Sequence, residues 1–404
     1  MGKNRLPDSL VDHSVKGKKI VLLVMDGLGG LPHPETGKTE LETARTPNLD
    51  ALAARSSLGA LIPVGPGVAP GSGPGHLSLF GYDPVEYLIG RGALSALGVG
   101  FDLRPGDLAA RLNLATLDSE GVVRDRRAGR PSDEEGRRVV GKVREAIQAP
   151  EGTEIFLEHE KEHRAVLILR GEGLQADLSD TDPQETGVPP HPVKALDPGS
   201  EKSASLMQDI LDQIRETLKD EDRVTGVLAR GFAAYEGYPG FEERYGLKAL
   251  AIAQYPMYRG VARLVGMEIR EIPSAPPELV EILEKRFQEY DFFFLHFKYP
   301  DSRGEDGDFQ AKVEAIEAVD PVISEILELQ PEVLVVTGDH STPANFKAHS
   351  WHSVPVLLAS PWARPTGDAF GETQCRLGDL GTFLGKDLMS LALAHAGRLS
   401  KFGA

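Results

Sequence analysis

The sequence predicts an α/β protein, with a doubly wound sheet into which an α+β unit is inserted. Apolar runs followed by acidic residues occur near the start and again in the last third of the chain, and the stretch between them differs in character. The chain has 404 residues and 41% hydrophobic content, more than one compact unit usually carries, so we expect two domains.

The first predicted element is a strand at Ile20–Met25, where the run IVLLVM follows charged residues and precedes Asp-Gly. Such a run fits a strand buried on both faces, as in a parallel sheet. A helix is expected at 46–56, with Thr46 as its N-cap and Pro47 in its first turn. Three later apolar runs repeat the strand pattern: Phe292–Phe297, Val333–Thr337 and Val354–Ala359.

The middle of the chain begins at the turn-rich segment DLRPGD, 102–107. Beyond it we expect short strands at 108–114 and 165–169, and helices at 133–149 and 203–219. This mixture is typical of an α+β unit. The predicted domains are a discontinuous core, 1–104 with 241–404, and an insert, 105–240.

Composition argues against several classes of protein. The formal net charge is -17 and the sequence pI is near 5.2, so binding to nucleic acid or to an anionic membrane is not expected. Cys375 is the only cysteine, which leaves no intramolecular disulfide. The N-terminus lacks the apolar core of a signal peptide, and no stretch is apolar enough to cross a bilayer. We therefore expect a cytoplasmic protein.

Acidic residues follow three of the predicted strands: Asp26, Asp301 and Asp339. The carboxyl ends of parallel strands meet at one edge, so these carboxylates should converge there and repel unless a cation neutralises them. His340, with His349 or His352, adds imidazole, and mixed ligation suits Mn, Zn or Fe better than Ca. Each residue alone is more often a turn, surface or core residue, so the prediction of a metal site depends on their coincidence.

A loop rich in Gly and Pro, 63–81, contains Ser72 between two glycines. A helix that starts here would point its N–H groups at an anion, and a metal ion could activate the hydroxyl for attack on phosphorus. The alternative is a flexible loop with incidental serines. A dinucleotide-binding fingerprint is not favoured, because the glycine spacing is wrong and no clear strand leads into the loop.

Several segments resemble the archaeal-type cofactor-independent phosphoglycerate mutases of the alkaline phosphatase superfamily. They include VLLVMDGLGG, PGSGPGHLSLFGYDP, DRRAGR, ARLVGM and VVTGDHSTP, and they span nearly the whole chain. The resemblance implies an alkaline-phosphatase-like core with a substrate-clamping insert. It also implies two divalent ions, with Mn favoured and Zn, Co, Fe or Mg open, and no 2,3-bisphosphoglycerate. The implied reaction interconverts 3-phosphoglycerate and 2-phosphoglycerate through a phosphorylated Ser72.

The resemblance also implies roles for individual residues. One metal would be held by Asp26, Ser72, Asp339 and His340, and the other by Asp301, Glu305 and His349. Asp125 would be the general base for the glycerate hydroxyls, and Arg259 would lie near the phosphoryl site. Substrate contacts would come from Arg126, Arg127, Arg130, His163, Arg164, Arg230 and Lys298. The alternative for the arginines around 124–130 is a solvated basic turn.

Some positions depart from the family's pattern. Glu305 stands where the family usually has histidine, Arg259 replaces a lysine, and the sequence His349-Ser350-Trp351-His352 leaves open which histidine is the ligand. Glutamate is an acceptable ligand, and arginine keeps the charge with a different geometry. A metal-dependent phosphatase of the same superfamily and a non-enzymatic descendant therefore remain alternatives, and the oligomeric state is open.

Overall fold

The computed structural model describes residues 8–403, whose contacts divide into two units. The core unit comprises the described residues up to Leu88 and those from Tyr238 onward, and the insert is Ile89–Gly237. The insert thus starts earlier than the predicted boundary at 105. The reason is that α4 (Arg91–Gly98) packs on the insert's strands β3 (Asp107–Leu117) and β7 (Gly226–Ala234).

The core unit is built on a seven-stranded sheet of order β12-β2-β11-β10-β1-β9-β8. β1 lies between β9 and β10 and is parallel to both, whereas β11 is antiparallel to β10 and β2. The four predicted strands are confirmed, but the sheet is mixed. Its strands are β1 Ile20–Met25, β2 Ser57–Ile62, β8 Ala249–Ala253, β9 Phe292–Phe297, β10 Val333–Thr337, β11 Val354–Ala359 and β12 Gly381–Leu384.

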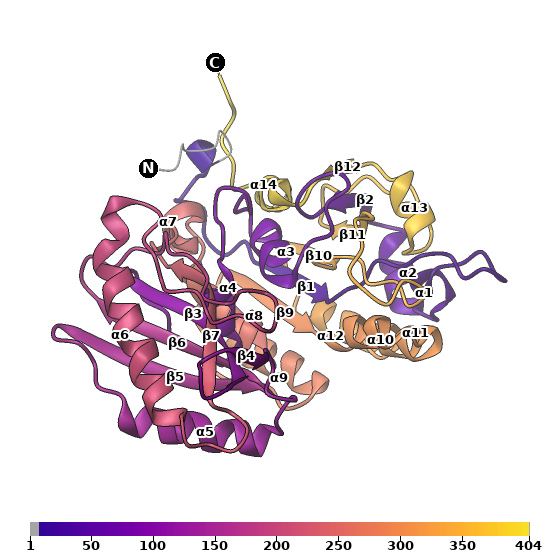
Figure 1. The fold of residues 1–404 in the computed structure, drawn as a ribbon. Coiled ribbons are helices and arrows are strands. Elements are labelled where there is room, and N and C mark those ends of the chain that lie inside the picture. The colour runs from indigo at the N-terminus through magenta and orange to yellow at the C-terminus, as the bar shows by residue number, and fades with distance from the viewer. Residues whose placement is uncertain (1–7, 404) are drawn as a thin grey trace. The chain divides into compact units, whose positions relative to one another are not determined.

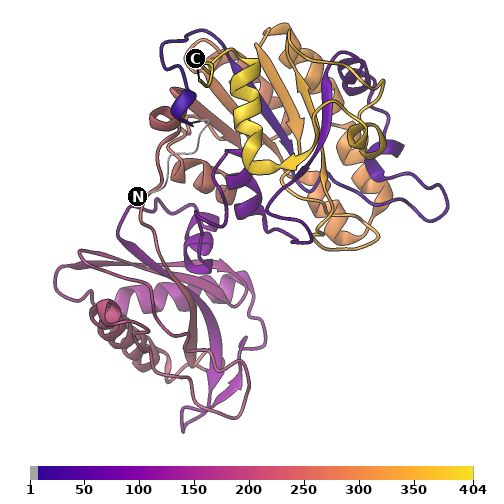
Figure 2. The same cartoon turned by 90° about the horizontal axis from the view of Figure 1, so that it is seen from above.

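Helices lie on both sides of this sheet (Figures 1 and 2), as expected of a doubly wound fold; α3 and α14 contact each other, as do α2 and α12. The α-helices of the core unit are α1 Glu40–Thr43, α2 Pro47–Ala53, α3 Ser72–Leu79, α7 Phe241–Tyr245, α8 Pro256–Leu264, α9 Pro276–Arg286, α10 Tyr299–Asp306, α11 Phe309–Glu317, α12 Asp320–Glu328, α13 Glu372–Arg376 and α14 Leu388–His395. Short 3-10 turns lie at Asp8–Leu10 and Gly385–Asp387.

The helix expected at 46–56 is shorter than predicted. Thr46 occupies the N-cap position and Pro47 the first turn, but the Thr46 side chain makes no capping hydrogen bond. The helix ends at Ala53 because Ser56 N bonds to Ala53 O at 3.1 Å, a turn that leads directly into β2.

The insert is an antiparallel sheet of order β4-β3-β6-β5, with β7 on β3. Its further elements are β4 Val123–Asp125, β5 Thr153–Lys161, β6 Arg164–Gly171, a 3-10 turn at Pro198–Ser200, α5 Asp133–Ala146 and α6 Glu201–Leu218. Apolar residues of β3 and β6, such as Leu112 and Leu167, form one core with α5 and α6. The predicted α+β character is confirmed.

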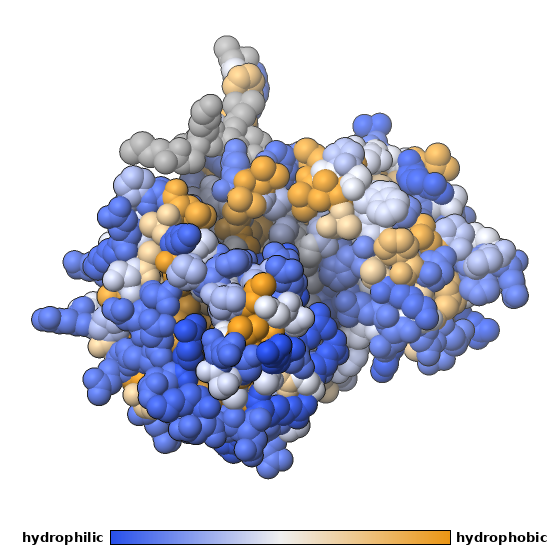
Figure 3. All heavy atoms as spheres, viewed as in Figure 1, coloured by the Kyte–Doolittle hydropathy of each residue, from blue (hydrophilic) through white to orange (hydrophobic). Residues whose placement is uncertain are grey.

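The surface agrees with the acidic composition. Hydrophilic residues dominate the face drawn in Figure 3, with separate apolar patches between them. Within residues 8–403, no helix has both the length and the apolar character needed to cross a membrane.

Candidate active site

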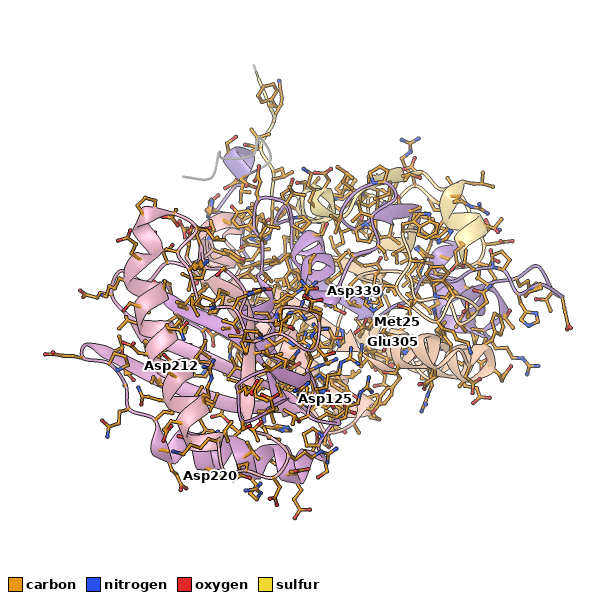
Figure 4. All side chains as sticks on the ribbon, in the orientation of Figure 1. Met25, Asp125, Asp212, Asp220, Glu305 and Asp339 are labelled. Carbon is orange, nitrogen blue, oxygen red and sulfur yellow. The ribbon has the colours of Figure 1, made fainter. Side chains whose placement is uncertain are left out.

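Three carboxylates lie at the carboxyl ends of neighbouring parallel strands in the core unit. Asp26 directly follows β1, Asp339 lies two residues after β10, and Asp301 is in the first turn of α10, which follows β9. All three side chains are buried. Pairing of β1 with β9 and β10 places these strand ends side by side, as the sequence predicts. Figure 4 labels Asp339 and Met25, the last residue of β1.

His340 joins two of these acids to the serine loop. Its Nε2 lies 3.2 Å from Asp26 Oδ1, 3.2 Å from Asp339 Oδ2 and 3.3 Å from Ser72 Oγ. Ser72 is the first residue of α3, so a helix does start in this loop. The structure therefore brings together the four residues expected at one metal.

The charges of this group are not balanced by hydrogen bonds. Both oxygens of Asp26, together with Asp339 Oδ2, are buried and make none. Burial raises the pKa of Asp26, but the imidazoles of His296 and His340 outweigh burial and hold that pKa well below its usual range. The Lys298 ammonium, 3.2 Å from Asp26 Oδ2, offsets one negative charge, but three buried carboxylates at one strand edge still favour a further cation beside them. Two carboxylates, an imidazole and a hydroxyl are donors that Mn, Zn or Fe accepts, so the residues fit a divalent metal.

The residues expected at the second metal are Asp301, Glu305 and His349; Asp301 and His349 lie with His340 in a set close enough to hold an ion, and Glu305 lies outside that set. His349 Nε2 lies 3.5 Å from Asp301 Oδ1 and 3.8 Å from Glu305 Oε1. Glu305 follows Asp301 by one turn of α10, and its side chain is 55% exposed. His349 Nδ1 is 2.8 Å from Pro70 O, which can only accept, so Nδ1 carries a proton and Nε2 can face the acids.

The sequence leaves open whether His349 or His352 is the metal ligand, and the geometry favours His349. His352 instead contacts Ser350 Oγ through Nδ1 at 3.1 Å and lines a separate cavity of about 180 Å³ beside Glu42 and Cys375. Of these two histidines, only His349 lies close enough to Asp301 to form an ion pair with it.

Two residues predicted near the phosphoryl group, Lys298 and Arg259, contact groups of the protein itself. Lys298 Nζ lies 3.2 Å from Asp26 Oδ2 and forms an ion pair with Asp301, so it contacts carboxylates. Burial lowers the pKa of Lys298, but these acids outweigh burial and raise it above its usual range, so the ammonium stays charged. Arg259 Nη1 donates to Ala253 O at 3.2 Å and to Gln254 O, at the end of β8.

Two histidines that line the cluster were not predicted from the sequence. His76 Nδ1 lies 2.8 Å from Ser72 O and 3.2 Å from Asp339 Oδ2, and His296 Nε2 lies 3.2 Å from Asp26 Oδ2. The spacing of four between Ser72 and His76 on one helix could have revealed the first. An imidazole inside the apolar strand FFFLHF could have revealed the second.

In the insert, the DRRAGR turn is held by its own polar groups. Asp125 accepts from Arg127 N at 2.8 Å and from Gly129 N at 2.6 Å. Arg126 makes two bonds to Asp182, at 2.9 and 2.8 Å, and Arg230 Nη1 lies 3.3 Å from the same buried carboxylate. The side chains of Arg127 and Arg130 are exposed. Asp182 had no signal in the sequence.

Several buried polar atoms around one face of the insert's sheet make no hydrogen bond. Pairing places Arg164 beside Asn113 and Arg230 beside Arg111. Arg111 Nε, Asn113 Oδ1, Arg164 Nε and His163 Nδ1 are buried and make no hydrogen bond. Burial, followed by Arg164 and Arg127, lowers the pKa of His163 to about 4, so it is neutral at pH 7. Arg111 and Asn113 were not predicted either, although two polar residues at spacing two in an apolar strand are a signal.

Comparison with known proteins identifies the family. A family model described as 2,3-bisphosphoglycerate-independent phosphoglycerate mutase matches residues 53–223. A Thermus thermophilus protein with that name, preceded by "probable", is 54% identical over 390 residues, 96% of each chain. A likewise named Deinococcus radiodurans protein is 49% identical over 393 residues, 96% of each chain. This chain belongs to the 2,3-bisphosphoglycerate-independent phosphoglycerate mutases.

Two solved structures agree with this membership. The PH0037 protein of Pyrococcus horikoshii is 31% identical with a TM-score of 0.79, and the match covers 96% of this chain and 100% of that one. The cofactor-independent phosphoglycerate mutase of Thermoplasma acidophilum is 28% identical with a TM-score of 0.76, over 94% and 100%. The expected fold and the archaeal-type resemblance are confirmed, and as a phosphoglycerate mutase the chain is an isomerase.

Proposed function

We propose that this chain interconverts 3-phosphoglycerate and 2-phosphoglycerate without 2,3-bisphosphoglycerate, through a phosphorylated Ser72. The observation that supports this most is the position of Ser72 Oγ, 3.3 Å from His340 Nε2, at the edge of a buried acidic cluster in which both oxygens of Asp26 and one of Asp339 make no hydrogen bond. A hydroxyl there is the nucleophile that phosphoryl transfer needs.

The proposed metal ligands are the two groups of the core unit. Asp26, Ser72, Asp339 and His340 hold one ion, and Asp301, Glu305 and His349 hold the other. Manganese is the ion we favour over Zn, Co, Fe or Mg, on the strength of mixed carboxylate and imidazole donors. When bound, the ions favour the ionised serine and offset negative charge on the transferring oxygens.

The chain's own groups account for the two transfers. Ser72 Oγ loses its proton and bonds to phosphorus while the bond from phosphorus to the 3-oxygen of the substrate breaks; that oxygen takes up a proton, which leaves phosphoserine and glycerate. The 2-hydroxyl of glycerate then attacks phosphorus, loses its proton and releases Ser72. The first turn of α3 directs backbone N–H groups toward the anion. Lys298 stays cationic beside the acids and lowers the repulsion that an incoming phosphate meets.

Glycerate must be retained between the transfers, and we assign this task to the insert. Arg126, Arg127, Arg130, Arg164 and Arg230 bind the carboxylate and phosphate groups, with neutral His163 as a hydrogen-bonding partner. Asp182 fixes Arg126 and Arg230 beforehand, which reduces the entropy lost on binding. Asp125 takes the proton of the reacting hydroxyl. The carboxylate oxygens that take it already accept hydrogen bonds from Arg127 N and Gly129 N of the same turn.

Arg259 remains in the proposal as a phosphate ligand near the phosphoryl site. In that role its guanidinium exchanges Ala253 O and Gln254 O for phosphate oxygens. The substrate class places the enzyme in glycolysis or gluconeogenesis and therefore in the cytoplasm.

The test follows conversion of 3-phosphoglycerate by ³¹P NMR, with no bisphosphoglycerate added, after chelation and again after Mn²⁺ is restored. We expect metal-dependent isomerisation that Ser72→Ala abolishes. Ser78→Ala, on the same helix and outside the cluster, should retain it. The exposed Glu305 carboxylate favours a second candidate, a phosphatase whose site admits water. Metal-dependent release of inorganic phosphate without isomerisation would replace the mutase with that candidate.

A further inference from the structure

Thr342 lies between the two candidate metal groups of the core unit. It is fully buried, and its Oγ1 is 2.7 Å from Asp301 Oδ1 and 2.9 Å from His340 Nδ1. Within residues 8–403 the carboxylate and imidazole groups close enough to hold an ion form two sets, and His340 belongs to both. Its Nδ1 lies 3.9 Å from Asp301 Oδ1, while its Nε2 faces Asp26 and Asp339. These distances alone therefore do not decide which of the two metal ions His340 binds.

The positions of the protons in the contacts of Thr342 with Asp301 and His340 decide which metal ion His340 can bind. A hydroxyl has one proton, and an ionised carboxylate can only accept, so Thr342 donates to Asp301. Its oxygen must then accept from His340, which requires a proton on Nδ1. With that proton in place, Nδ1 has no lone pair left for a metal. The lone pair available for ligation is on Nε2, which faces Asp26, Asp339 and Ser72.

We propose that Thr342 is a positioning residue that fixes the Nδ1–H tautomer of His340 and so assigns its Nε2 to the Asp26–Asp339 metal. The inference rests on the metal role of these residues in the proposed function. The same hydroxyl orients Asp301, so one side chain sets a ligand of each group. Partners behind the ligands of a metal commonly fix ring orientation and tautomer in this manner.

The surroundings hold the Thr342 hydroxyl in place. Lys312 Nζ donates to Thr342 O at 2.8 Å and to Gly27 O and Gly29 O at 2.9 and 3.0 Å. Thr342 N donates to Gly29 O at 3.1 Å. A Cβ on Gly304 would lie 2.1 Å from Thr342 O, and one on Gly27 would lie 2.7 Å from Thr342 Oγ1. The backbone is therefore fixed, and little space remains for another position of the hydroxyl.

The first test compares Mn²⁺ binding by titration calorimetry to wild type, Thr342→Val and Thr342→Ser. Valine keeps the volume and removes the hydroxyl, and we expect affinity at the Asp26–Asp339 site to fall about 10–100-fold. Serine keeps the hydroxyl, and we expect near wild-type affinity despite the lost methyl. Thr337→Val is a matched control, because it removes a buried hydroxyl that bonds Pro355 O at 2.9 Å. It should lower the melting temperature without weakening Mn²⁺ binding.

Wild-type affinity in Thr342→Val, or equal losses in the valine and serine variants, would overturn the proposal. A second measurement needs no variant to fold at that position. In Zn²⁺-loaded wild type, imidazole ¹⁵N spectra assigned with His340→Gln should show Nδ1 protonated and Nε2 bound to metal. Metal on Nδ1 would refute the inference. Both readouts are independent of catalysis, so a wild type that binds metal without isomerising phosphoglycerate would remove only the proposed function.

Discussion

Both units contain buried atoms without hydrogen bonds, including Glu160 Oε2 in the insert and Arg244 Nη1 in the core unit, but the sets at the two candidate sites differ in charge. In the core unit they include carboxylate oxygens of Asp26 and Asp339, at the edge of a largely parallel sheet. In the insert they include guanidinium nitrogens of Arg111 and Arg164, on the face of an antiparallel sheet. The first set needs a cation and the second an anion. A metal and a phosphorylated acid supply these two charges, which is why we assign them to different units.

The largest expected effect tests the core side of this comparison. Asp339→Asn keeps the shape but removes the charge beside His340, and we expect a loss of about three orders of magnitude in kcat/KM, roughly 4 kcal/mol. Mn²⁺ should no longer raise the melting temperature, because binding to the folded state stabilises it. The control is Asp212→Asn, an exposed position of α6 (Figure 4), which should leave both the activity and the Mn²⁺ response unchanged. An unaltered response of Asp339→Asn to Mn²⁺ would contradict the ligand assignment.

The next prediction concerns Lys312, whose ammonium bonds the backbone turns next to the carboxylates of the core unit. Lys312→Met removes the three hydrogen bonds that the buried Lys312 Nζ donates to backbone carbonyls, which should cost about 3 kcal/mol of unfolding free energy. Urea denaturation of the metal-free protein measures this. Lys285→Met, whose side chain is 61% exposed, should change stability little. If the two variants are equally stable, the buried ammonium does not hold the turns together.

The site of the core was more predictable than that of the insert, for a physical reason. Asp26 and Asp339 follow buried parallel strands, and parallel strands bring their carboxyl ends to one edge. Arg111 and Asn113 meet Arg164 and Arg230 only through the register of antiparallel pairs, which a single sequence does not show. A single sequence also does not show that Lys312 Nζ donates a hydrogen bond to Thr342 O next to the carboxylates of the core unit.

The insert side of the comparison predicts an effect on binding. Arg164→Met should raise KM for 3-phosphoglycerate by roughly 30-fold, about 2 kcal/mol for a lost charge-assisted contact, with a smaller change in kcat. Mn²⁺ affinity should stay at the wild-type value, since the core holds the metal. Arg215→Met, at an exposed position of α6, is the control. A fall in kcat at constant KM would place Arg164 in the transfer step instead.

The smallest effect is on the insert's stability. Glu221 accepts from Arg138 at 2.6 Å and from Lys142 at 2.7 Å, and the hydrogen bond to Arg138 is the first cause that lowers its pKa to about 2 from 4.5. A lowered pKa stabilises the folded state above pH 4.5, and this is lost as pH falls toward 2. Both basic partners are exposed, so Glu221→Gln should cost about 1 kcal/mol at neutral pH.

Denaturation at several pH values measures this difference. The difference in unfolding free energy between wild type and Glu221→Gln should become smaller as the solution is acidified. The exposed Glu216, paired with Lys219, supplies the control: Glu216→Gln should show almost no gap at any pH. A gap for Glu221→Gln that widens in acid would contradict a lowered pKa in the folded state.

The central claim is that Ser72 receives the phosphoryl group, and peptide mass spectrometry tests it most directly. The Mn²⁺-loaded enzyme is mixed with 3-phosphoglycerate, quenched in acid within one turnover and digested. We predict one phosphoryl group on the peptide that contains Ser72, absent after chelation and absent from Ser72→Ala. Isomerisation without phosphorylation of Ser72, or the same modification on another residue, would contradict the account.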